Sequence, residues 1–270
     1  MLAALVIVFR EVLEAGLIIS VILAACRGVP VRKHVLAGVL AGMGGAVIMA
    51  SFTDYLESML DGRGLEIFSA SVLLLAVLML SWQVLWISAS GKRYANSCYR
   101  EAERLIAEKQ GYYSIAILVA LTVLREGAEI VLFLYSLSLT ATGSAGVGML
   151  VGGITGVLLG ILVSWSVYSG LVLISLRTVF AASNFLLMFI AAGLASQAAG
   201  ILASVDMLPM LGWQIWDTSF LLSDSSWAGN LAHTLLGYTA TPSGIQFCAW
   251  FLVFVGIFFL RFYLLHREQH

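Results

Sequence analysis

Two short stretches of this sequence place acids and a base inside otherwise apolar runs. Residues 10–14 read Arg-Glu-Val-Leu-Glu and residues 125–129 read Arg-Glu-Gly-Ala-Glu, so the pattern R-E-x-x-E occurs twice. On an α-helix, side chains three or four positions apart share a face, so both glutamates of a copy point the same way and its arginine reaches the second one. The candidate metal ligands are Glu11, Glu14, Glu126 and Glu129, with Arg10 and Arg125 as supporting groups.

If the two faces meet, four carboxylates and two guanidiniums form one pocket with an excess of negative charge, which favours binding of a cation. A pocket with oxygen ligands alone selects hard ions such as ferric iron, magnesium, calcium or manganese over copper(I) or zinc. A trivalent ion would compensate the crowded carboxylates best, and its binding would release protons. The alternative is that each motif is an internal ion pair that fixes helix packing. A buried ion pair adds little net stability, however, and does not require the second acid.

The chain as a whole has the composition of a membrane protein. It is 61% hydrophobic and only 11% of its residues are charged, whereas a soluble domain carries about 25% charged residues. So few charges cannot cover a globular surface in water, which leaves lipid as the solvent and partner. An ionisable residue inside the bilayer is costly and is a candidate functional residue by default.

We therefore predict an all-α membrane protein, with residues 1–270 forming a single integral membrane domain. A spanning helix needs about 20 mostly apolar residues. Seven stretches qualify, and they run over about 2–25, 35–53, 67–90, 113–141, 147–175, 179–203 and 244–265. The very short connection at 176–178 predicts that the fifth and sixth helices are antiparallel neighbours. The longest connection, 204–243, is an outer loop that contains Pro209, Gly212, Gly229, Gly237 and Pro242.

An internal duplication relates the first six helices. The two motifs are 115 positions apart, which indicates one repeat over about 1–90, a second over about 113–203, and a seventh helix at 244–265. Glycines at four-residue spacing, which let membrane helices pack closely, occur in the second and fifth helices. Gln83 and Gln197 fall at nearly the same offset and could hydrogen-bond the motif side chains. A 3+3 inverted repeat is a common transporter plan, with the substrate site near the bilayer midplane.

Basic residues predict the orientation. The first, third and fifth connections and the C-terminal end hold eleven basic residues, and the opposite side holds only Arg63. The positive-inside rule then places the N-terminus outside and the C-terminus in the cytoplasm. Four acids on the outer side are weaker candidates for an access path for metal: Asp54, Glu57, Asp217 and Asp224. They equally suit a solvated helix end or turns, where aspartate is common.

At these residues the sequence resembles the oxidase-dependent iron transporters, the iron permeases of fungi and bacteria. That family is marked by R-E-x-x-E on its first and fourth helices, and the outer-loop stretches 216–219 and 222–225 look like its bacterial members. The family usually has glycine at the third motif position, where this chain has Val12 in the first copy. The resemblance implies import of ferric iron across the bacterial inner (plasma) membrane, with the glutamates as ligands and iron as substrate rather than a bound cofactor. It also implies a periplasmic or oxidase partner protein.

Other functions remain open from the residues alone. The pocket would also suit transport of another cation, such as ferrous iron, manganese or lead, or a metal sensor or scaffold subunit that does not transport. A membrane haem enzyme or an intramembrane serine protease would need histidines within its helices. His34, His233, His266 and His270 all fall away from helix centres, so we expect no enzyme activity, and we expect no nucleic-acid partner.

Overall fold

The chain folds into long α-helices. The structure is a computed structural model that describes residues 1–26, 31–60, 62–107, 113–140, 145–169, 176–212, 214–220, 222, 229, 232–233 and 236–267. Seven helices lie in this part of the chain: α1 (Leu2–Ala25), α2 (Arg32–Met59), α3 (Arg63–Ala107), α4 (Tyr113–Thr140), α5 (Ala145–Tyr168), α6 (Leu176–Ser204) and α8 (Gly244–Arg267). No strand occurs among these residues, so the predicted all-α class is confirmed.

The helices have the length and the surface of membrane spans. Five of them, α2, α3, α5, α6 and α8, are long and apolar enough to cross a bilayer with at most two charges in the apolar stretch. Helices α1 and α4 exceed that limit because each carries the three charges of its R-E-x-x-E motif. Large apolar side chains such as Ile48 on α2, Leu158 on α5 and Leu252 on α8 point outward. A helix satisfies its own backbone hydrogen bonds, which lipid cannot do.

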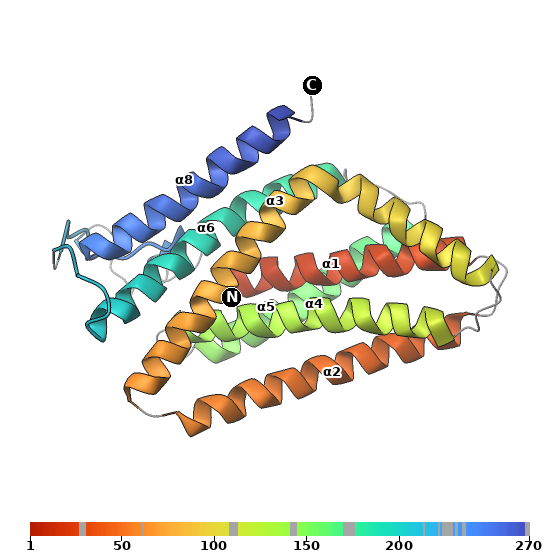
Figure 1. Cartoon of the computed structure of the whole chain (residues 1–270), viewed down its shortest axis with the longest axis horizontal. Helices are drawn as coiled ribbons and strands as arrows, with labels where there is room; N and C mark the ends of the chain where they lie inside the picture. The colour runs from red at the N-terminus through yellow and green to blue at the C-terminus, as the bar shows by residue number, and fades with distance from the viewer. Residues whose placement is uncertain are drawn as a thin grey trace.

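Two details of the predicted helices need correction. Helix α3 does not end near residue 90 but continues to Ala107, over 45 residues, about twice the length needed to span a bilayer. Its apolar span covers Arg63–Leu85, and Figure 1 shows that α3 bends and that its second part points in another direction. The polar stretch after the span, predicted as a connection, is therefore helical.

The prediction that the fifth and sixth helices are neighbours was wrong. Helix α5 ends at Tyr168, so the connection to α6 is longer than the sequence indicated. Over the described ranges, α5 packs along α1, whereas α6 packs against α3 and α8. Chain order does not decide helix contacts here, because the glycine-rich face of α5 fits α1.

The two most extensive helix pairs correspond to each other under the 115-residue offset between the motifs. Helix α5 packs on α1, and α2 packs on α4. A Cβ added to Gly156 of α5 would lie 2.8 Å from the carbonyl oxygen of Leu5, and one added to Gly42 of α2 would lie 2.7 Å from that of Ala120. Leu5 and Ala120 are equivalent under the 115-residue offset. In both pairs, a glycine of the neighbouring helix packs directly against the backbone of the motif helix.

The third residue of each motif also faces the neighbouring helix of its pair. Val12 of α1 faces Gly160 of α5, and Gly127 of α4 faces Ala46 of α2. The larger residue is on the motif helix in the first half and on the neighbouring helix in the second. The helices therefore pack closely in both halves, although Val12 stands where the family that the sequence resembles usually has glycine.

The remaining helices build the core beside the motif helices. Buried side chains from α1, α3, α4, α6 and α8 form one cluster that includes Ile7, Leu80, Phe133 and Met188. Inside a bilayer such a cluster is stabilised by van der Waals packing, because lipid tails are as apolar as the side chains. Figure 1 shows α1 and α4 running in opposite directions side by side, with α2 on the outer side of α4. Of the motif residues on these two helices, Arg10, Glu11, Glu126 and Glu129 are buried, Glu14 is partly buried and Arg125 is exposed.

The described residues of the connection between α6 and α8 contact each other and both helices. The Thr218 N–H donates to the carbonyl oxygen of Ala240, and the indole N–H of Trp250 donates to that of Leu236. Gly237 has a φ of 67° and packs against Gly193 of α6. A side chain at either glycine would collide with the opposite backbone. The part of this connection around Leu236 and Gly237 therefore packs against α6 and α8.

Candidate metal site

Three glutamates from the two motif helices meet in the interior of the bundle. One carboxylate oxygen from each of Glu11, Glu126 and Glu129 lies within 4.8 Å of the other two. All three residues are at most 6% exposed. Oxygens on opposite sides of a small hard cation, with bonds of about 2.0–2.1 Å, are about 4 Å apart. Binding such an ion would need only a small contraction of the group.

Each motif arginine pairs with glutamates of its own helix. The Arg10 guanidinium lies 2.8 Å from Glu14 Oε1 and 3.4 Å from Glu11 Oε1. Arg125 Nε lies 3.1 Å from Glu129 Oε1 and 3.8 Å from Glu126 Oε1. The spacing of R-E-x-x-E thus makes the arginine a link between both acids of its motif. The guanidiniums offset part of the repulsion between carboxylates that lipid would otherwise leave uncompensated.

The two arginines differ in their surroundings. The Arg10 side chain is fully buried, whereas 47% of the Arg125 side chain is exposed. Glu14 also differs from its equivalent, because the group of three close carboxylates includes Glu129 but not Glu14. One Glu14 oxygen instead lies 2.8 Å from the Arg10 guanidinium. The structure therefore gathers three of the four expected glutamates closely, with the fourth one helical turn away on α1.

A glutamine from a third helix completes the cluster. Gln83 of α3 is 4% exposed. Its amide nitrogen donates to Glu129 Oε2 at 2.7 Å and to both carboxylate oxygens of Glu11 at 3.1 and 3.2 Å. The sequence offered only the offset between Gln83 and Gln197 as a signal, and that offset did not say which glutamine would reach the acids.

Two buried oxygen atoms of the cluster accept no hydrogen bond within the described structure. They are Glu126 Oε2 and Gln83 Oε1. A buried polar atom without a partner costs about 1–3 kcal/mol, so such atoms are uncommon unless another group satisfies them. Both atoms are Lewis bases of the kind that hard cations bind. The donor set therefore fits a cation better than it fits a closed hydrogen-bond network.

Of the four weaker candidates for an access path, the structure describes the side chains of Glu57 and Asp217. Glu57 lies half-buried in the last turn of α2. Asp54 lies in the same helix, but its side chain falls outside the described residues, as does the whole of Asp224. Asp217 is exposed, and the Ser219 hydroxyl and backbone N–H both donate to its carboxylate, which holds the pKa of Asp217 below its usual value. Asp217 thus has the role of a turn residue in this structure.

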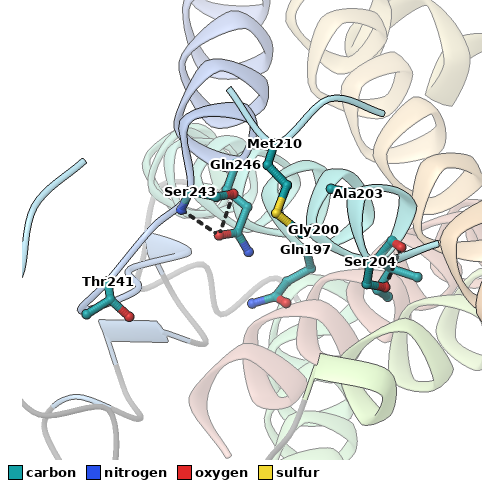
Figure 2. A pocket seen from close by; sticks show the side chains of 9 residues that line it. Gln197, Gly200, Ala203, Ser204, Met210, Thr241, Ser243 and Gln246 are labelled. Carbon is teal, nitrogen blue, oxygen red and sulfur yellow. Dashed lines mark hydrogen bonds between the residues drawn. The ribbon is translucent and has the colours of Figure 1, made fainter. Parts of the chain in front are cut away.

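Gln197, the counterpart of Gln83, lies elsewhere. Its amide nitrogen is 3.0 Å from His233 Nε2, and His233 Nδ1 is 2.7 Å from the carbonyl oxygen of Tyr238. Because a carbonyl only accepts, His233 Nδ1 donates to it, and Nε2 of the neutral ring accepts from Gln197. Gln197 also borders an open cavity of about 350 Å³ between α6, the start of α8 and the loop, which Figure 2 shows with Met210 and Gln246 on its wall.

Comparison with known proteins agrees with these features. The family described as "Iron permease FTR1 family" matches residues 1–267. The chain is similar to "Ferrous iron permease EfeU" of Escherichia coli O6:K15:H31, with 25% identity over 94% of this chain and 93% of the relative. It is similar to the protein of the same name from Yersinia pestis, with 25% identity over 97% of this chain and 93% of the relative. No solved structure matches the chain.

Proposed function

The chain belongs to the iron permease FTR1 family, and we propose on that premise that it carries iron into the cytoplasm through the site between α1 and α4. The observation that carries this proposal is the meeting of two R-E-x-x-E motifs, 115 positions apart in sequence, in one buried group of carboxylates. The family is one of permeases, which is a transporter class and not an enzyme class. The residues below therefore bind and release an ion and catalyse no reaction.

The carboxylates replace the water shell of the cation during its passage. Glu11, Glu126 and Glu129 offer charged oxygens at a depth where lipid offers none, and this lowers the free-energy barrier for a charged substrate. Arg10 contacts the carboxylate of Glu11, and Arg125 contacts those of Glu126 and Glu129, so the guanidiniums balance these charges before an ion arrives. Because protons and metal compete for the carboxylates, arrival of the ion displaces any protons bound there. A static ion pair, the alternative function of the motifs, would not need carboxylates of both helices within reach of one ion.

We propose ferric iron as the transported form, because the site offers only oxygen ligands and several negative charges, which suit a hard trivalent ion. Ferrous iron is the second candidate, and it is favoured by the name of the two relatives, ferrous iron permease. Purified protein in liposomes distinguishes the two forms if uptake of radioactive ferric citrate is compared with uptake of ferrous iron kept reduced. Uptake of the ferrous form alone would overturn the ferric assignment and leave the site assignment intact.

The site assignment has its own test in the same liposomes. Glu126→Gln keeps the shape of the side chain and removes its charge, so uptake of either form should fall to the level of empty liposomes. Glu66→Gln changes an exposed acid in the first turn of α3 and should leave uptake unchanged. Uptake by Glu126→Gln at the wild-type rate, in protein that inserts normally, would refute the role of the cluster.

We further propose that the chain lies in the bacterial plasma membrane with its N-terminus outside and its C-terminus in the cytoplasm. The excess of basic residues on the connections that share a side with the C-terminus supports this orientation. The loop between α6 and α8 would then face the outside, where a partner protein would deliver iron. Reporter fusions to the C-terminus that were active only on the outer side would contradict this orientation.

A further inference from the structure

The side-chain amide of Gln83 lies between two buried carboxylates of the candidate metal site. Its NH₂ group lies between the carboxylates of Glu11 on α1 and Glu129 on α4, with donor distances of 2.7–3.2 Å to three of their oxygens. An NH₂ group has two hydrogens and a partial positive charge, so it can satisfy both carboxylates at once. Gln83 therefore connects the two halves of the molecule from a helix that carries no motif.

The other end of the same amide is unused. Gln83 Oε1 is buried and has no hydrogen-bond partner among the described atoms. The terminal torsion of a glutamine side chain is broad and roughly two-fold, so a rotation of the amide exchanges the positions of its oxygen and its nitrogen. After such a rotation, the oxygen would face the space between the carboxylates that the nitrogen now faces.

We propose that Gln83 is a further ligand of the transported ion, and this inference rests on the proposed function of the carboxylate cluster. In the absence of the ion, the amide nitrogen holds Glu11 and Glu129 together. When iron reaches the carboxylates, it takes over the oxygens that accept from the nitrogen, the amide rotates, and Gln83 Oε1 binds the ion. Carbonyl oxygens are common ligands of hard cations. A neutral fourth ligand adds an oxygen without adding another charge that the empty site would have to compensate.

A role in positioning alone makes a different prediction. If Gln83 acted only as a donor that fixes the carboxylates, any variant without the NH₂ group would fail. If it is a ligand, the oxygen is what the bound ion requires. Gln83→Glu keeps an oxygen at the same reach and removes the donor, whereas Gln83→Leu removes both. Gln197→Leu is the matched control, because Gln197 is the equivalent residue but bonds to His233.

The test measures binding of iron, supplied in turn as ferric citrate and as ferrous iron under anoxic conditions, to the full-length protein in lipid nanodiscs. Gln83→Leu should weaken binding by about tenfold or more, the range seen when groups around metal ligands are removed. Gln83→Glu should bind at least as tightly as the wild type, and Gln197→Leu should bind like the wild type. Equal weakening in Gln83→Glu and Gln83→Leu would overturn the ligand role, and so would unchanged binding in Gln83→Leu.

A second measurement does not depend on the folding of the Gln83 variants. The infrared difference spectrum between iron-bound and iron-free protein, labelled with carbon-13 in its glutamine side chains, should contain a carbonyl band that shifts on binding and persists in Gln197→Leu. A spectrum without such a band would overturn the ligand role. Loss of binding in Glu126→Gln without any effect of Gln83→Leu would overturn this inference alone. Absence of iron binding by the wild-type protein would overturn the proposed function as well.

Discussion

At the scale of single residues, the site is defined by how buried charges are compensated. Glu11, Glu126 and Glu129 lie together in the interior of the bundle, and each contacts the arginine of its own motif. Arg10 is buried and contacts two glutamates, so its charge is the main compensation for the first motif. Arg125 also contacts two glutamates, but 47% of its side chain is exposed.

This difference between the arginines predicts unequal effects of their removal. Arg10→Met leaves Glu11 and Glu14 without their cation and should cost about 3–5 kcal/mol of stability, the range for breaking a buried pair. Arg125→Met should cost less, because the Arg125 side chain is exposed and its shortest ion pair, at 3.1 Å, is longer than the 2.8 Å pair of Arg10. Melting temperatures of the two purified variants in the same detergent measure this order. Equal melting temperatures would show that the burial of Arg10 has no energetic consequence.

The carboxylates also predict how iron binding depends on pH. A proton and the metal compete for the same oxygens, so each fall in pH should weaken the binding of iron, and binding should release protons. Titrations in two buffers of different ionisation enthalpy, from neutral to mildly acidic pH, measure both effects. An affinity that stays constant over that range would mean that carboxylates are not the ligands.

The sequence predicted most of this site, but not all of its members. The spacing of R-E-x-x-E predicts which side chains share a helix face, because that follows from helix geometry alone. Which of the four glutamates come close together depends on how α1 and α4 approach each other, and Glu14 stays outside the group of three. The role of Gln83 depends on the approach of α3, on which neither motif lies, so no local pattern could distinguish Gln83 from Gln197.

At the scale of helices, close packing fixes the motif helices in place. Gly156 and Gly42 bring α5 and α2 against the backbones of α1 and α4. The apolar runs predicted seven helices, and the structure has a helix at each of them. Their partners were harder to predict, because hydropathy identifies spans but does not say which faces fit together. The sequence did not predict that α3 continues past its apolar span, because a polar helix leaves no hydropathy signal.

The glycine contacts predict a clear difference between neighbouring positions. Gly156→Ala would place a methyl group 2.8 Å from the backbone of α1, and neither backbone can rotate away, so it should cost about 1–3 kcal/mol. Gly153→Ala is the matched control on the same helix, because a Cβ there meets nothing within 4 Å. Gly42→Ala and Gly44→Ala repeat the comparison on α2. Melting temperatures should fall in the first member of each pair only, and an equal fall in both members would contradict this packing.

At the scale of the whole molecule, the two halves share their packing but not the surroundings of the site. The contacts of α1 with α5 and of α2 with α4 follow the internal duplication, whereas Gln83 reaches the carboxylates and Gln197 bonds to His233 beside the cavity. An ion in the site would be held by residues of both halves. Movement of one half against the other would then change its ligands, as the alternating-access plan of repeat transporters requires.

The central claim is that both motifs bind one shared ion, and the amount of bound iron per chain tests it most directly. Wild-type protein in nanodiscs should bind one iron, and either Glu11→Gln or Glu126→Gln should abolish that binding, although the two residues lie on different helices. Two irons per wild-type chain, with one lost in each variant, would mean that the motifs form separate sites and would contradict the account.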